Sequence, residues 1–167
     1  LFDPAKGIFI ARAPGRLDLM GGIADYSGSL VLQWPLREST LVAAQLAEDG
    51  LLQATSLREG EGNPRICALR VDELFPDSRP LEYDRARQWF AEHPALGWAG
   101  YVLGVLIVLA REKGLPSPKG VRLLIRSSVP EGKGVSSSAA LEVATMQALA
   151  AAMGFELEPR ELALLAQ

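Results

Sequence analysis

The feature that most constrains this sequence is a glycine- and serine-rich segment, VPEGKGVSSSAALEVA at residues 129–144. A strand-like run, VRLLIRS, precedes it, and a long run of strong helix formers at 139–153 overlaps its end. Gly132 and Gly134 allow positive φ and a close approach of the backbone to a ligand. The unpaired N–H groups and partial positive charge of a helix N-terminus favour an anion. The segment therefore predicts a phosphate-binding loop.

Three consecutive hydroxyl groups lie where the predicted helix begins. Ser136, Ser137 and Ser138 can cap the helix, bind phosphate oxygens, or complete the coordination of a Mg²⁺ that keeps most of its waters. The segment is not a Walker A loop, because Lys133 is followed by Gly134 and not by Ser or Thr. The alternative is a serine-capped helix after a glycine turn. A cap needs one hydroxyl, so three behind two spaced glycines favour phosphate.

A second charged, glycine-rich segment follows the first strand-like run. APGRLDLMGGIADYSG, residues 13–28, places Arg16, Asp18 and Asp25 among four glycines. Charged side chains in such a loop at a strand end converge on a polar ligand. The alternative is a solvated loop with an internal salt bridge, and this segment alone leaves both interpretations open.

The rest of the sequence predicts an α+β unit. Apolar and β-branched runs predict strands at residues 8–13, 30–34, 40–47, 51–57, 66–71 and 121–127. Helical patterns predict helices at 83–90, 98–113, 139–153 and from 159 onward. Residues 72–94 otherwise look irregular. Turn residues at 13–15 are expected to end the first strand, and the Asp49-Gly50 step predicts a β-hairpin between its flanking strands.

The composition limits which classes of partner and which cellular compartment we expect for this protein. The 167 residues carry 17 Lys and Arg against 20 Asp and Glu, a net charge of −3, with 49% hydrophobic residues, so we expect at most one compact domain and no nucleic-acid partner. A single cysteine, Cys67, and a single histidine, His93, fit a reducing, cytoplasmic setting without a His-rich metal site. The most apolar run, residues 98–110, is shorter than a membrane span, so we expect a buried helix and no membrane partner.

Together, the two glycine-rich segments resemble the GHMP kinases, a family that includes galactokinase, homoserine kinase, mevalonate kinase and phosphomevalonate kinase. Residues 13–28 resemble the galactokinase-type substrate signature, and residues 129–144 resemble the family's phosphate-binding motif, in matching order and separation. Trp98-Ala-Gly-Tyr101 resembles a segment of the nucleotide pocket in galactokinases. The resemblance runs from about Phe2 to the last residue. Within the galactokinase-like branch it is closest to the L-arabinokinases, notably in GRLDLMGGIADYSGSLVLQ.

This resemblance implies the fold of the GHMP kinase N-terminal domain, which is ribosomal-protein-S5-domain-2-like. We expect a mixed sheet with helices packed on one face, and residues 1–167 as one ATP- and sugar-binding domain. The Gly-x-Met-Asp-Gln type segment that carries the family's catalytic Asp does not occur here. We therefore expect a C-terminally truncated kinase, a C-terminal GHMP domain outside this sequence, and negligible turnover by the chain alone.

The resemblance also implies residue roles. Arg16 is the catalytic candidate, near the transferring phosphoryl group and the attacking anomeric hydroxyl. The implied substrate-binding residues are Arg16, Asp18, Gly22, Asp25 and Tyr26. The implied nucleotide-binding residues are Trp98, Tyr101, Pro130, Gly132, Lys133, Gly134, Val135, Ser136, Ser137, Ser138 and Ala139. Ser138 is also the expected contact of the Mg²⁺ that accompanies ATP. For Trp98 and Tyr101 the alternative is core packing on one helix face, and Lys133 could equally face water.

The implied activity is ATP-dependent phosphorylation of a pyranose at its anomeric hydroxyl. Galactokinases carry Glu-His where this sequence reads Gly22-Ile23, and that Glu binds the sugar's exocyclic hydroxymethyl group. L-Arabinopyranose lacks this group, and a buried carboxylate left without a partner would cost about 1–3 kcal/mol. With Gly22 at this position, a bound pentose leaves no such acceptor unpaired. We therefore expect L-arabinose rather than galactose. Two alternatives stay open: a non-catalytic sugar and nucleotide sensor on the same fold, and another GHMP small-molecule kinase, such as a galactokinase or a relative acting on mevalonate or homoserine.

Overall fold

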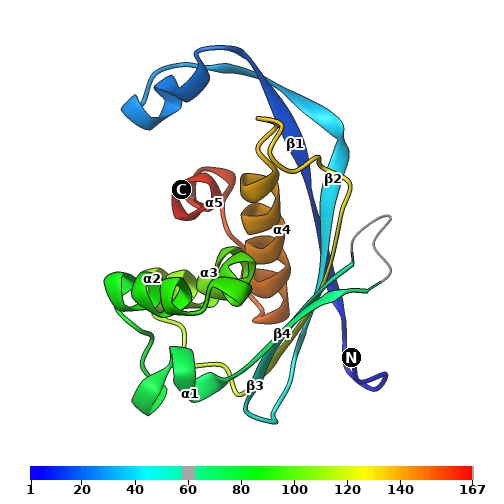
Figure 1. Ribbon diagram of the computed structural model, residues 1–167, viewed down its shortest axis with the longest axis vertical. Coiled ribbons are helices and arrows are strands. Elements are labelled where there is room, and N and C mark those ends of the chain that lie inside the picture. The colour runs from blue at the N-terminus through cyan, green and yellow to red at the C-terminus, as the bar shows by residue number, and fades with distance from the viewer. Residues whose placement is uncertain (58–62, 167) are drawn as a thin grey trace.

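The computed structural model describes residues 1–57 and 63–166, with the side chains of Ile23, Asp25 and Tyr26 excepted. The described strands form one mixed sheet in the order β1-β2-β5-β3-β4. They are β1 (Phe9–Met20), β2 (Leu32–Leu46), β3 (Leu51–Leu57), β4 (Arg65–Arg70) and β5 (Val121–Ser127). Figure 1 shows the helices gathered on one face of this sheet. The expected α+β class and the one-sided helix layer are confirmed.

The helices follow the predicted pattern closely. They are η1 (Gly22–Ser27), α1 (Val71–Leu74), η2 (Pro76–Ser78), α2 (Tyr83–Glu92), η3 (Pro94–Leu96), α3 (Gly97–Lys113), α4 (Ser137–Ala152) and α5 (Pro159–Leu165). The helices expected at 83–90 and 98–113 are confirmed. Residues 71–78, which gave no helical pattern, contain the short helices α1 and η2.

The core lies between the sheet and the pair α3 and α4. Helix α4 packs against β1, β2 and α3, and it buries alanines at four-residue spacing that allow close approach. Residues 94–113 have a mean hydropathy of 1.6 and could cross a membrane by length and composition alone, but the core helix of a folded domain passes the same test. Eight residues of α3 are buried in this domain, among them Leu103, Leu106 and Ile107. The expectation of a buried helix is therefore confirmed.

The first two strands are longer than predicted. No turn ends β1 at Ala13-Pro14-Gly15, and the strands expected at 30–34 and 40–47 form the single strand β2. Proline is tolerated in β1 because this strand lies at the sheet edge, and the register shifts between Pro14 and Arg16. Because β5 pairs with β2 only from Thr40 to Leu46, the far halves of β1 and β2 form a two-stranded ribbon.

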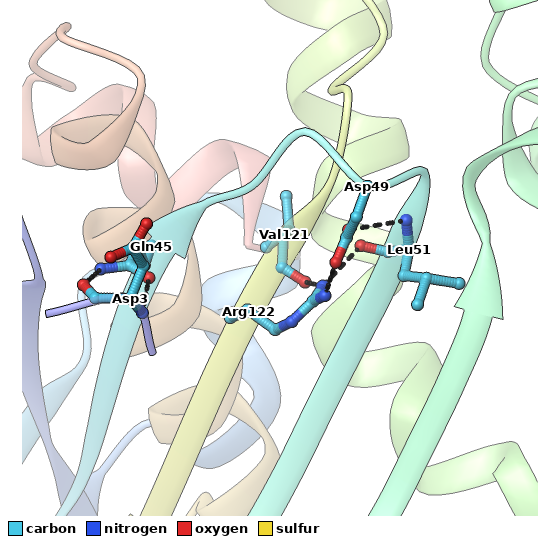
Figure 2. A network of polar contacts seen from close by, with 6 residues as sticks. All are labelled: Asp3, Gln45, Asp49, Leu51, Val121 and Arg122. Atoms are coloured by element: carbon cyan, nitrogen blue, oxygen red, sulfur yellow. Dashed lines mark hydrogen bonds and ion pairs between the residues drawn. The ribbon is translucent and has the colours of Figure 1, made fainter. Parts of the chain in front are cut away.

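The predicted hairpin at Asp49-Gly50 is wrong. Strand β5 lies between β2 and β3, antiparallel to the first and parallel to the second, so the two strands that flank Asp49 never pair. Figure 2 shows the hydrogen bonds that hold the segment between β2 and β3. The Arg122 side chain donates to the Asp49 carboxylate and, at a distance of 3.0 Å, to the carbonyl oxygen of Leu51. The Gly50 N–H donates to the Lys119 carbonyl at 2.8 Å. A local turn signal cannot reveal a strand that inserts from far along the chain.

Candidate functional site

The loop between β5 and α4 has the backbone of an anion-binding loop. Gly132 and Gly134 have φ of +69° and +71°, and Ser136 has φ of +57°. Left-handed residues at such spacing can turn neighbouring N–H groups toward one side of the loop, which suits an anion. A non-glycine residue in this region costs about 1–3 kcal/mol, and such strain clusters at ligand sites. The local geometry therefore fits a phosphate group.

Helix α4 begins at Ser137, two residues before the predicted start. Ser136 is the N-cap residue, yet its hydroxyl makes no capping hydrogen bond, and only its carbonyl oxygen accepts from the Ala140 N–H, at 3.0 Å. The serine-capped interpretation therefore does not describe this helix. Among the residues that the structure describes, none hydrogen-bonds the first N–H groups of α4 or the Ser136 hydroxyl, so these groups can bind a ligand.

A backbone hydrogen bond joins the two glycine-rich segments. The Arg16 N–H in β1 donates to the carbonyl oxygen of Val135 in the loop, at 3.0 Å. A Cβ on Gly15 would lie 2.8 Å from Val129 Cγ1 and 3.0 Å from the Val135 carbonyl oxygen. Only glycine allows this approach without displacing a neighbour. The predicted phosphate loop and the predicted substrate strand are thus packed directly against each other.

The Arg16 side chain lines a cavity of about 300 Å³ between the β1–β2 ribbon and the first turns of α4. The lining residues are Ala13, Pro14, Arg16, Gln33, Pro35, Ala139, Ala140 and Val143. The Nε atom of Arg16 is buried and has no hydrogen-bond partner among the described residues. A buried donor without a partner is unfavourable by about 1–3 kcal/mol, and an anionic ligand would satisfy it. This orphaned atom supports a phosphate or a polar substrate in the cavity.

A second cavity, of about 260 Å³, connects α3 with the N-terminus of α4. Its lining residues are Ser56, Arg65, Trp98, Tyr101, Ile125, Ser127, Glu131, Ser137, Ser138 and Leu141. Tyr101 is 49% exposed, so it is not a core residue, and Trp98 is half-buried. An aromatic pair beside two helix N-terminal serines suits a base next to a phosphate chain. Sequence reasoning missed Arg65, because a single arginine at the start of a strand gives no distinctive pattern.

The substrate segment lies on the ribbon and in η1. Asp18 is exposed, and its Oδ1 accepts a hydrogen bond from Gln33 Nε2 at 2.6 Å. Gly22 has φ of +53°, and a Cβ added there would meet no described atom within 4 Å. The side chains of Asp25 and Tyr26 lie outside the described residues, so their predicted contacts remain predictions. Figure 1 shows η1 beyond the end of the ribbon, on the side of the sheet that carries the helices.

The remaining predicted residues divide by exposure. Pro130, Gly132, Lys133 and Gly134 are exposed on the loop, while Ala139 is half-buried. No described group of three or more His, Cys, Asp or Glu side chains could hold a metal ion. Ser138, the expected Mg²⁺ contact, is exposed in the first turn of α4.

Cys67 takes no part in either cavity. The residue is 1% exposed, and burial raises the pKa of its thiol to about 11. A thiol that stays protonated at neutral pH is a poor nucleophile, so Cys67 is a packing residue, as expected.

Comparisons with known proteins cover both segments. Residues 100–167 match the family model for the GHMP kinases N terminal domain, and residues 1–46 match the galactokinase galactose-binding signature. An L-arabinokinase of Arabidopsis thaliana is 44% identical over 189 residues, which cover all of this chain and 18% of that protein. A galactokinase of Chloroflexus aurantiacus is 36% identical over an alignment that covers 95% of this chain and 35% of that protein. The chain thus spans well under half the length of these relatives.

Solved structures show the same fold. A mevalonate kinase of Methanococcus jannaschii superposes with a TM-score of 0.73 at 18% identity, covering 98% of this chain and 46% of that one. The galactokinase of Lactococcus lactis complexed with galactose superposes with a TM-score of 0.69 at 26% identity, covering 97% of this chain and 37% of that one. The two motifs, their direct contact and the matches over the whole chain agree: this chain belongs to the GHMP kinase family.

Proposed function

We propose that this chain forms the ATP- and sugar-binding part of a kinase that phosphorylates L-arabinose at its anomeric hydroxyl. The observation that carries the proposal is the contact between Arg16 and Val135, which sets the acceptor strand against the phosphate loop. Phosphoryl transfer needs mainly positioning and charge neutralisation, and these two segments together offer both. The C-terminal GHMP domain would complete the cleft and provide the catalytic Asp.

On the donor side, the backbone of residues 132–138 and the N-terminus of α4 would hold the ATP phosphates. Trp98 and Tyr101 would contact the nucleotide base from α3. A Mg²⁺ held by Ser138 and the phosphate oxygens would neutralise the charge of the β- and γ-phosphates. No residue of this chain needs to react covalently for this role.

On the acceptor side, Arg16 would stabilise negative charge at the transferring phosphoryl group, since its buried Nε has no other described partner. Asp18, Asp25 and Tyr26 would bind the sugar hydroxyls. The choice of L-arabinose rests on Gly22, which offers no carboxylate for a hydroxymethyl group, and on the 44% identity to a protein named L-arabinokinase.

A coupled assay of sugar-dependent ADP release tests this proposal. The enzyme that contains this chain and a C-terminal GHMP domain should release ADP with L-arabinose, and more slowly with galactose. The 167-residue chain alone should show negligible turnover and still bind ATP. Equal efficiency with galactose would refute the Gly22 argument, and strong turnover by the chain alone would refute the need for a second domain.

A further inference from the structure

Gln33 in β2 connects the two parts of the acceptor site. It is paired in register with Asp18 of β1, and its Nε2 donates to Asp18 Oδ1 at 2.6 Å. Gln33 also lines the cavity that contains Arg16 and the first turn of α4. The Gln33 side chain therefore contacts Asp18, a residue that is predicted to bind the sugar. It also borders the space where the phosphoryl group would be transferred.

The chemistry of this pair leaves groups free for a substrate. An amide has two N–H donors and an acceptor oxygen, and a carboxylate accepts several hydrogen bonds. Among the described residues, Gln33 and Asp18 make no other side-chain hydrogen bond that would occupy these groups. The amide must direct its nitrogen toward the carboxylate, so its oxygen and second N–H remain for a ligand. Sugar hydroxyls, which both donate and accept, match this set.

We propose that Gln33 is a positioning and specificity residue for the sugar substrate. It holds the Asp18 carboxylate toward the cleft and contributes its own amide to a ring hydroxyl. This inference rests on the proposed function and deepens it, because it adds to the acceptor site a residue outside the glycine-rich segment 13–28 and outside the phosphate loop. A hydrogen bond to a charged acceptor is stronger than a neutral one, so the pair can hold its orientation in an open cleft.

A second cross-strand contact in the same sheet offers a matched control. Arg12 Nε donates to Ser39 Oγ at 2.9 Å, and this bond also joins an exposed side chain of β1 to a half-buried one of β2. Neither Arg12 nor Ser39 lines the cavity around Arg16. If the Gln33–Asp18 bond only joined the strands, its loss would resemble the loss of the Arg12–Ser39 bond, because exposed cross-strand pairs contribute little to folding.

The test compares Gln33→Met, Gln33→Glu and the control Ser39→Ala in the complete kinase, with KM measured separately for L-arabinose and ATP. Gln33→Met keeps the side-chain length and removes the amide. It should raise KM for L-arabinose about tenfold, the effect of about 1.4 kcal/mol, with KM for ATP and the melting temperature close to wild type. Ser39→Ala should leave both KM values unchanged.

Gln33→Glu adds a signature that a structural role would not produce. Two carboxylates at this distance repel each other when both are ionised, and a proton that they share once the pH is lowered removes the repulsion and restores a hydrogen bond between them. KM for L-arabinose should therefore be higher than in Gln33→Met at neutral pH and should fall as the pH is lowered. An active wild type with unchanged sugar KM in both Gln33 variants would overturn this inference alone. A wild type without sugar-dependent ADP release would overturn the proposed function, and this inference with it.

Discussion

The donor and acceptor sides of this cleft are built in opposite ways. The predicted phosphate loop lies against the core: Val129 and Ala140 are buried on either side of it, and the backbone between them has positive φ at Gly132, Gly134 and Ser136. The acceptor side is a two-stranded ribbon whose apolar side chains, such as Met20 and Trp34 at 71% and 62% exposure, have little packed around them. Under the proposed function, phosphate binding would be set by backbone and core, whereas sugar choice would depend on a few side chains. Substrate preference could then change without disturbing the fold.

Arg16 joins the two sides, so its loss should have the largest effect. Arg16→Ala should lower kcat about a thousandfold, because a guanidinium at a transferring phosphoryl group stabilises its transition state by that order. Arg12→Ala is the matched control, since Arg12 lies on the same strand and binds only Ser39 and the Arg37 carbonyl among the described residues. Steady-state kinetics measure both. Equal losses in the two variants would contradict the assignment of Arg16.

Ser138 tests the donor side by itself. Ser138→Ala should lower kcat about a hundredfold, the size expected when one stabilising contact to the phosphates or their metal ion is removed. The Mg²⁺ concentration for half-maximal rate should rise, and KM for L-arabinose should not change. A Mg²⁺ titration of the rate measures both effects. An unchanged Mg²⁺ requirement would remove Ser138 from the metal site.

Gly15 tests the contact between the two sides. Gly15→Ala should reduce the free energy of unfolding by about 1–3 kcal/mol, because the new Cβ would overlap Val129 and the Val135 carbonyl. Nucleotide affinity should fall as the loop moves away. Gly104→Ala is the control: its Cβ would meet nothing within 4 Å in helix α3, so it should stabilise by up to about 1 kcal/mol. Urea denaturation measures both. Equal effects would mean that the contact at Gly15 is loose.

Gly22 tests the acceptor side by itself. Gly22→Glu should shift the ratio of kcat/KM values from L-arabinose toward galactose about tenfold, because the carboxylate has room to extend and would be left unpaired by a pentose. The positive φ costs about 1 kcal/mol in stability. Gly28→Glu carries the same charge and a similar strain, with φ of +75°, at a position without an assigned role. Competition assays with both sugars measure the ratio. An identical shift in both variants would reject the specific role of Gly22.

The same contrast explains what the sequence could predict. The loop before α4 was predictable because its signals are local: glycines, serines and a helix start lie side by side. The ribbon was not, because Pro14 and Gly15 signal a turn locally, whereas the edge position of β1 and the pairing with β2 turn them into strand residues. The Asp49-Gly50 hairpin was predicted wrongly for a similar reason, since β5 enters between its strands. Gln33 and Arg65 were missed because only folding brings them to the cavities.

Glu142 should give the smallest effect. It lies one helical turn after Ser138 on α4, and partial burial raises its pKa above the ordinary value of 4.5. The folded state therefore binds this proton more tightly than the unfolded state, and the free energy of unfolding falls as the pH rises through the interval between the two pKa values. Glu142→Gln should remove this dependence and stabilise the protein above that interval by less than about 1 kcal/mol. Urea denaturation as a function of pH measures the effect, and identical pH profiles would contradict it. Since the core holds α4 in place, Glu142→Gln should leave the nucleotide affinity unchanged. A substitution on the β1–β2 ribbon, by contrast, should change the affinity for the sugar.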